Sequence, residues 1–371
     1  MMDFYIWCLG LLNQRINIKT IELTVTETRF SEISSKSSFF ILHAHKFYAM
    51  ENNKTIFKEE AATQKNVPSL GVNLEEIIPS FQTVFPQTRY FEIDSRIAGN
   101  RFSAWVTVPA GYDQQKSESF PIVYQIDANL YFPSTAPFHL ATHGDVMSTL
   151  RPFILVSIGY SQEESHRWDW LRVRDLVPSG DVVPEIFYQT LDGTVQTGIM
   201  SQEESEVYRA MFAKPAGDKY LSFLENELHP LLTQIFQIDQ NDVGLWGFSY
   251  GGLFTSYVAL KRSNLFKNIG AGSPGIVGKD SYIFKLYDEA IASKMDFSGR
   301  RLHVTLGARE LSSPGPYQWL TARGTSELLA QTSLQPLPGM QVSSEIIPLE
   351  THLTGGVLAW FSFLRAFYSK S

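Results

Sequence analysis

The stretch Gly247-Phe248-Ser249-Tyr250-Gly251 has the form G-x-S-x-G and lies between two apolar segments. Residues 242–246 before it predict a short buried strand, and residues 252–260 after it predict a helix packed against a sheet. A strand, a sharp turn carrying serine and a helix form the elbow that exposes a nucleophilic serine. The helix start also offers backbone N–H groups and a positive dipole end to a developing oxyanion. We therefore predict a nucleophilic Ser249 rather than a glycine-rich structural turn.

A regular alternation of strands and helices surrounds this stretch from residue 86 onward. Further strands are predicted at 87–94, 101–108, 120–127, 152–158, 266–272, 301–306 and 342–347. Further helices are predicted at 219–236, 282–293, 317–332 and 356–368. An antiparallel opening hairpin followed by alternating strands and helices predicts an α/β fold, with a mostly parallel central sheet and helices on both faces.

The composition excludes several classes of function. The chain of 371 residues carries a net charge of −7 without clustered lysine or arginine, so no nucleic-acid partner is expected. No apolar run reaches the roughly 18 residues of a membrane span. The single cysteine, Cys8, excludes an intrachain disulfide and fits a reducing compartment. We expect a cytoplasmic protein, with the periplasm as the alternative.

The N-terminal part differs from the rest of the chain. Residues 13–65 mix short β-prone pieces with polar stretches, and residues 1–65 are expected to be a poorly ordered extension before a hydrolase domain at 66–371. The apolar run at 4–12 is short and lacks the flanks of a signal peptide. Polar residues follow Met50, as at the start of a soluble protein. We expect residues 1–49 to be a mis-assigned upstream extension; an ordinary internal Met50 is the alternative.

A long polar segment, residues 161–216, interrupts the alternation of strands and helices. It leaves the carboxyl end of a predicted strand, which is the edge where open α/β sheets bind ligands. Long connections inside a compact domain are commonly functional or disordered. We interpret this segment as a lid or substrate-binding insertion.

A serine nucleophile needs a base, and in this chain order the base follows the serine. Only His303 and His352 follow Ser249. His303 lies within a predicted strand and is interpreted as structural. His352 lies in a loop between the last predicted strand and the last helix, from which it can reach the serine. We predict His352 as the general base.

The acid that would orient this base is less clearly marked. After the last aspartate, Asp296, the carboxylates before His352 are those of Glu310, Glu327, Glu345 and Glu350. Glu310 follows a predicted strand at the sheet edge, where an orienting carboxylate belongs, and is our choice. The alternatives are a surface Glu310 paired with Arg309 or Arg323, and a Ser–His dyad without an acid.

Two backbone N–H groups are expected to bind the oxyanion. Tyr250 directly follows the serine and supplies one of them. The loop after the 120–127 strand should supply the other, from Asn129 or, as the second choice, Ala128.

These motifs resemble those of the "Putative esterase" (esterase D-like) branch of the α/β-hydrolases, and within it the trilactone siderophore esterases of the enterobactin and salmochelin type. The resemblance covers roughly residues 85–370 and is carried by four stretches: Ile126-Asp127-Ala128-Asn129, Ser157-Ile158-Gly159-Tyr160, 172–178 and 247–254. The chain departs from the family pattern, with Phe248 in place of histidine, Ala128 in place of glycine and Val177 in place of threonine. Since the family's acid is weak or missing, Glu310 stays open.

The resemblance implies that Arg172 contacts an acidic or catecholate part of the substrate. From the residues alone, a pairing of Arg172 with Asp169 or Asp175 is equally expected. Recognition of catecholates would use several basic side chains, and the insertion offers Arg167, Arg172, Arg174 and Arg209.

Tyr131 and Trp170 are candidates for lining a substrate pocket, with core packing as the alternative. His139 and His143 have the i, i+4 spacing of metal ligands on a helix, but no third ligand is evident, and we expect no metal.

The sequence thus predicts a serine esterase that acts on a small-molecule ester without metal or organic cofactor. A siderophore-type trilactone esterase is the first interpretation. A generic acyl esterase, thioesterase or acyltransferase is the second, and a non-catalytic binding protein on the same scaffold is the third. The sequence does not indicate an oligomeric state.

Overall fold

A computed structural model describes residues 80–370 except 115–117, 279 and 316. The predictions about residues 1–65 and Met50 lie outside the described residues. The described residues divide into a larger unit, 87–184 with 208–371, and a smaller one that includes 80–86 and 185–207.

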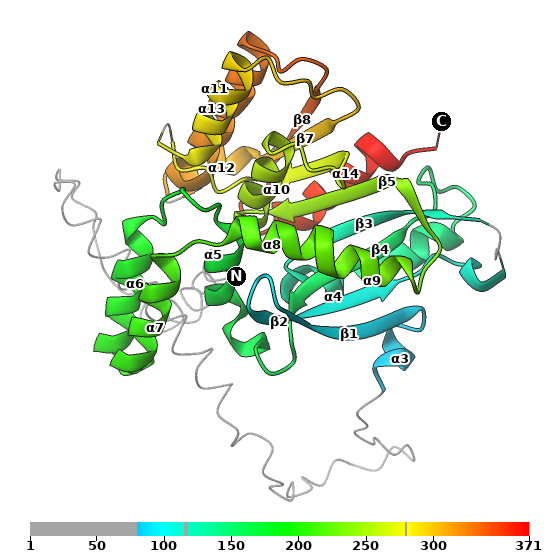
Figure 1. The fold of residues 1–371 in the computed structure, drawn as a ribbon, viewed down its shortest axis with the longest axis horizontal. Coiled ribbons are helices and arrows are strands. Elements are labelled where there is room, and N and C mark those ends of the chain that lie inside the picture. Colours follow the sequence, from blue (N-terminus) through cyan, green and yellow to red (C-terminus); the bar gives the residue numbers. More distant parts are fainter. Residues whose placement is uncertain (1–79, 115–117, 279, 316, 371) are drawn as a thin grey trace, which may run out of the picture. The chain divides into compact units, whose positions relative to one another are not determined.

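The larger unit is built on one eight-stranded sheet, with the strand order β1-β2-β4-β3-β5-β6-β7-β8 (Figure 1). The strands are β1 (Thr88–Ser95), β2 (Asn100–Thr107), β3 (Phe120–Ile126), β4 (Ile154–Tyr160), β5 (Ile238–Phe248), β6 (Asn268–Gly272), β7 (Arg301–Gly307) and β8 (Gln341–Ile347).

Pairing is antiparallel from β1 to β2 and from β2 to β4, and parallel for all other neighbours. The order reverses around β3, because the chain first crosses to β4 on one side and then to β5 on the other. Such a reversal leaves a crevice at the carboxyl ends of the strands, where ligands bind in open α/β sheets. This is the α/β-hydrolase arrangement that the alternation of elements predicted.

Helices cover both faces of the sheet in the larger unit (Figure 1). One face carries α4 (Ala128–Gly144) and α14 (Gly355–Tyr368). The other carries α10 (Tyr250–Leu260), packed against α5 (Trp168–Leu176) and α11 (Tyr282–Ala292). The remaining helices of this unit are α8 (Gly217–Phe223), α9 (His229–Thr233), α12 (Ala308–Ser312) and α13 (Arg323–Leu334).

Large aromatic side chains fill the space between the sheet and the α4/α14 layer. Trp246 on β5 packs edge-to-face on Trp360 of α14, with ring centroids 5.3 Å apart. Both side chains are about 1% exposed. Complete burial of such large side chains is among the strongest contributions to the stability of the fold.

The predicted helix at 219–236 is interrupted in the structure. A π-helical segment, Leu224–Leu228, separates α8 from α9. Pro230 lies at the start of α9, where its missing N–H and its ring break the regular hydrogen-bond ladder. The predicted helix at 317–332 likewise begins with a π-helical segment, Gln318–Ala322.

The insertion at 161–216 contains α5, α6 (Glu185–Gln196) and α7 (Gln202–Phe212). Its two ends belong to the larger unit, whereas 185–207 belong to the smaller one. None of the helices in the described ranges is both long and apolar enough to cross a membrane.

Candidate active site

Ser249 lies at the turn between β5 and α10 in a strained backbone conformation, with φ 59° and ψ −116°. A non-glycine residue with positive φ at such a turn is typical of a functional site. The neighbouring glycines allow the turn. A Cβ on Gly247 would lie 2.4 Å from the Gly251 carbonyl oxygen, and one on Gly252 would lie 2.5 Å from that of Gly272. The strand–serine–helix context predicted from the sequence is therefore present.

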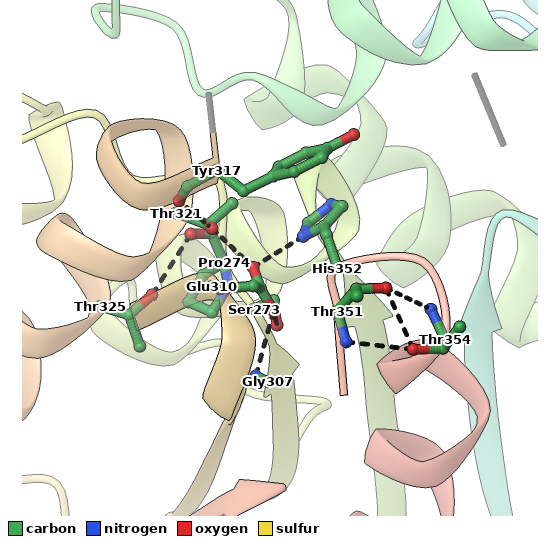
Figure 2. A network of polar contacts seen from close by, with 10 residues as sticks. All are labelled: Ser273, Pro274, Gly307, Glu310, Tyr317, Thr321, Thr325, Thr351, His352 and Thr354. Carbon is green, nitrogen blue, oxygen red and sulfur yellow. Dashed lines mark hydrogen bonds and ion pairs between the residues drawn. The ribbon is translucent and has the colours of Figure 1, made fainter. Parts of the chain in front are cut away.

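His352 lies in the loop between β8 and α14 and contacts Glu310 on the short helix α12. Its Nδ1 atom is 2.9 Å from Glu310 Oε2 (Figure 2). Both side chains are buried. Because the carboxylate is an acceptor, this contact favours a proton on Nδ1, and in that tautomer Nε2 is the acceptor that a general base would need.

Three further donors hold the Glu310 carboxylate in place. Ser273 Oγ donates to Oε1 at 2.6 Å and Thr321 Oγ1 to Oε2 at 2.7 Å, while the Gly307 backbone N–H donates to Oε1 at 3.0 Å (Figure 2). Burial alone raises the pKa of Glu310, but the bonds from His352, Ser273 and Thr321 outweigh it and leave the pKa below its ordinary value. The burial and these contacts do not fit the alternative of a surface glutamate paired with Arg309 or Arg323.

The imidazole of His352 contacts two aromatic rings. Tyr317 stacks on it with a centroid distance of 4.0 Å and an interplanar angle of 15°. The Phe248 ring lies 4.9 Å from it. Phe248 directly precedes Ser249, so His352 is packed against the elbow.

A second link joins the elbow to the acid. The backbone N–H of Ser249 donates to the Gly272 carbonyl at 2.9 Å, and the next residue, Ser273, is the one that bonds Glu310. The topology explains this, because β5, β6 and β7 are neighbours and their carboxyl ends carry Ser249, Ser273 and the start of α12. Sequence reasoning missed Tyr317, Ser273 and Thr321, and no motif marks them.

The two predicted oxyanion-binding groups lie at helix starts. Tyr250 is the first residue of α10, and Asn129 is the second residue of α4. N–H groups at a helix start carry the positive end of the helix dipole, which favours a developing oxyanion. The Asn129 side chain accepts from the backbone N–H of Tyr160 at 2.9 Å, which ties the start of α4 to the end of β4. A Cβ on Gly159 would lie 2.3 Å from that side-chain oxygen, so only glycine leaves room for it.

Arg172 bonds neither Asp169 nor Asp175, whose pairing with it was one of the two alternatives from the sequence. Its guanidinium forms a bidentate ion pair with Asp127. Nε donates to Oδ1 at 2.9 Å, and Nη2 donates to Oδ2 at 2.7 Å. Asp127 lies 45 residues earlier, and only the fold brings the two together. Asp175 is instead bonded by Arg174.

Tyr131 and Trp170 both have packing roles. The Tyr131 ring packs edge-to-face on Trp246 and Phe248. The Trp170 ring packs on Tyr208 and Phe212 within the larger unit. Both are less than a tenth exposed, which agrees with the core-packing alternative. A contact of either ring with substrate stays a prediction.

Three other histidines considered in the sequence have contacts with side chains outside the candidate site. His303 on β7 bonds Ser343 and Ser362, as a structural strand residue would. The rings of His139 and His143 contact each other and Phe153. Within the described ranges no group of three or more histidine, cysteine, aspartate or glutamate side chains is arranged to hold a metal.

The strained serine between β5 and α10, together with a histidine–carboxylate pair carried after β7 and β8, defines a protein of the α/β-hydrolase class. Within that class, the chain belongs to the esterase family described as "Putative esterase", whose model matches residues 95–300. This match includes the elbow and Arg172 and ends before Glu310 and His352.

Two bacterial esterases are similar to this chain in sequence, which agrees with the family assignment. The ferri-bacillibactin esterase BesA of Bacillus subtilis is 26% identical over 204 residues, which are 55% of this chain and 61% of that protein. An apo-salmochelin esterase of Escherichia coli is 21% identical over 236 residues, which are 63% of this chain and 64% of that protein. The chain therefore spans less than two thirds of the length of these two relatives.

Solved structures show the same fold. The BES protein from Bacillus cereus superposes with a TM-score of 0.59 at 20% identity, covering 81% of this chain and 99% of that one.

Proposed function

We propose that this chain is a serine hydrolase that cleaves carboxylic esters through an acyl-enzyme at Ser249. The observation that carries the proposal is the connection of the strained serine to a buried His352–Glu310 pair. The Phe248 ring packs on His352. The Gly272 carbonyl accepts from the Ser249 N–H, and the next residue, Ser273, donates to Glu310. A nucleophile, a base and an orienting acid linked in this way are what acyl transfer requires.

In the proposed reaction, Ser249 Oγ attacks the ester carbonyl carbon while His352 Nε2 takes the hydroxyl proton. The carbonyl oxygen becomes an oxyanion, which the N–H groups of Tyr250 and Asn129 stabilise. When the oxyanion collapses, the bond to the alcohol oxygen breaks and His352 returns the proton to the leaving alkoxide. Water then attacks the acyl-enzyme with His352 as base, and the acid product leaves as Ser249 regains its proton.

The proposed substrate is a siderophore-type trilactone, by similarity to relatives whose names are ferri-bacillibactin esterase and apo-salmochelin esterase. One observation favours simpler acyl esters as the second candidate. At least three of the four arginines that were candidates for binding a catecholate already have carboxylate partners. These pairs are Arg167 with Glu164, Arg172 with Asp127 and Arg174 with Asp175. A cytoplasmic location is proposed from the single cysteine alone.

Hydrolysis by the purified full chain tests the proposal. p-Nitrophenyl acetate, butyrate and octanoate are compared with ferric and apo enterobactin, with Ser249→Ala as the control. We expect ester turnover that disappears in Ser249→Ala while the variant keeps its thermal unfolding midpoint. A fluorophosphonate should label the wild-type protein at Ser249 and should not label Ser249→Ala.

The outcomes separate the candidates. Trilactone turnover far above that of the simple esters supports the siderophore substrate, and turnover of simple esters alone favours the second candidate. Wild-type turnover retained by Ser249→Ala refutes the nucleophile, and a wild-type protein without turnover or labelling favours a non-catalytic binding protein.

A further inference from the structure

A buried carboxylate lies beside both helix starts that would bind the oxyanion. Asp127 is the N-cap residue of α4, with φ 62° and ψ 49°, and its side chain is about 1% exposed. It directly precedes Ala128 and Asn129. Its Oδ2 atom also reaches the first turn of α10, since a Cβ placed on Gly251 would lie 3.3 Å from it.

Such a carboxylate opposes the proposed chemistry unless it is neutralised. Two negative charges close together in a site of low dielectric repel each other much more strongly than in water. An unpaired Asp127 would therefore destabilise the transition state, in which negative charge develops on the substrate oxygen.

Arg172 neutralises the Asp127 carboxylate through the bidentate ion pair described above. Its Nη2 atom also donates to the Phe248 carbonyl at 3.3 Å. The same guanidinium therefore bonds Phe248, which precedes Ser249, and Asp127, which precedes Ala128. The rings of Trp168 and Tyr250 lie over the guanidinium, at 5.7 and 5.4 Å from its central carbon. With these contacts Arg172 joins the starts of α4 and α10 from one side.

We propose that Arg172 is a positioning residue of the oxyanion-binding site, which neutralises Asp127 and holds the first turns of α4 and α10 together. This inference rests on the proposed ester hydrolysis. It assigns Arg172 a role in turning over every ester, including uncharged ones, rather than in reading an acidic group of the substrate.

The test is a double-mutant cycle on a neutral ester, p-nitrophenyl butyrate, with Arg172→Gln, Asp127→Asn and the double variant. Asparagine suits position 127 because it tolerates the left-handed conformation. We expect Arg172→Gln to lower kcat by roughly 10²-fold, as for the loss of an oxyanion donor, with little change in KM. The double variant should recover at least about tenfold of that loss, since it removes the uncompensated charge.

Arg174→Gln is the matched control, because it breaks another buried arginine–aspartate pair on the same helix. Its kcat should stay within about twofold of wild type, since only interactions that strengthen in the transition state change kcat, and Arg174 bonds Asp175 rather than Asp127 or the Phe248 carbonyl. Should Arg172→Gln fail to fold, Arg172→Lys replaces it. Lysine keeps the positive charge but cannot form the bidentate contact with the carboxylate. We therefore expect Arg172→Lys to lower kcat less than Arg172→Gln, at unchanged KM.

Three results would overturn the inference: an unchanged kcat on the neutral ester in the Arg172 variant, an effect limited to KM for catecholate substrates, or a double variant no better than Arg172→Gln. The failure of the proposed function is a separate result. In that case the wild-type protein neither turns over any ester nor reacts with a fluorophosphonate.

Discussion

Glu310 Oε2 lies 2.9 Å from His352 Nδ1, although the two residues are separated by 42 positions in the chain. Four donors converge on this carboxylate, from His352, Ser273, Thr321 and the Gly307 backbone. For the proposed base His352, a carboxylate fixed in this way favours a catalytic triad over a Ser–His dyad.

The replacement Glu310→Gln tests whether the acid matters. We expect kcat on p-nitrophenyl butyrate to fall by roughly 10²- to 10⁴-fold, because an amide no longer enforces the tautomer with the proton on Nδ1. The control is Glu345→Gln, which removes a carboxylate that Ser362 bonds outside the site. If kcat is the same in Glu310→Gln and wild type, a Ser–His dyad operates.

The stacking of Tyr317 on His352 should contribute to catalysis. An aromatic pair of this kind is worth about 0.5–1.5 kcal/mol, so Tyr317→Leu should lower kcat by about two- to tenfold. Tyr317→Phe keeps the stacked ring and should stay close to wild type. Steady-state measurement of kcat for the two variants shows whether the stacked ring contributes. Equal losses in both would assign the effect to the hydroxyl instead of the ring.

Gly252 should not tolerate a side chain. An alanine Cβ there would lie 2.5 Å from the Gly272 carbonyl oxygen, which accepts the Ser249 N–H. We expect Gly252→Ala to destabilise the protein by about 1–3 kcal/mol, as overpacking does, and to displace Ser249. Denaturant unfolding and esterase activity measure the two effects. Gly144→Ala is the control, since nothing lies within 4 Å of its Cβ position. A Gly252→Ala variant with wild-type stability and activity would contradict the elbow geometry.

The histidine pair on α4 should make the fold sensitive to acid. Burial, followed by the nearby Lys370 charge, lowers the pKa of His143 to about 4. Burial and then His143 lower the pKa of His139. Both imidazoles are therefore neutral in the folded protein, whereas in the unfolded chain they bind protons below a pH of about 6.5. Stability is fully present above that value and falls as the pH drops from 6.5 toward 4.

For His143 alone, this linkage corresponds to a loss of about 2 kcal/mol between pH 8 and pH 5. Denaturant unfolding at a series of pH values should show a shallower acid slope in His143→Gln than in wild type. His166→Gln, at an exposed histidine, should leave the slope unchanged. Identical slopes for His143→Gln and wild type would show that the imidazole is already charged in the folded state.

Local patterns in the sequence were enough for much of the fold. The hairpin of β1 and β2, the alternation of strands and helices and the elbow at Ser249 all follow from hydrophobic periodicity and glycine placement, which act within a few residues. The order of residues along the chain limited the predicted base to two histidines, and the loop position favoured His352. Glu310 could be chosen only as one of several glutamates, because a strand position does not show which side chain a distant loop will meet.

By itself, the sequence determined the elements and the position of the serine, since these depend on local backbone preference and side-chain periodicity. Only the tertiary structure decided which side chains meet. The pairing of Arg172 with Asp127, in place of Asp169 or Asp175, arises because the reversal of strand order around β3 brings the starts of α4 and α10 together. The contacts of Ser273 with Glu310 and of Tyr317 with His352 likewise join segments that are far apart in the chain. Strand order sets such contacts, and no local pattern encodes it.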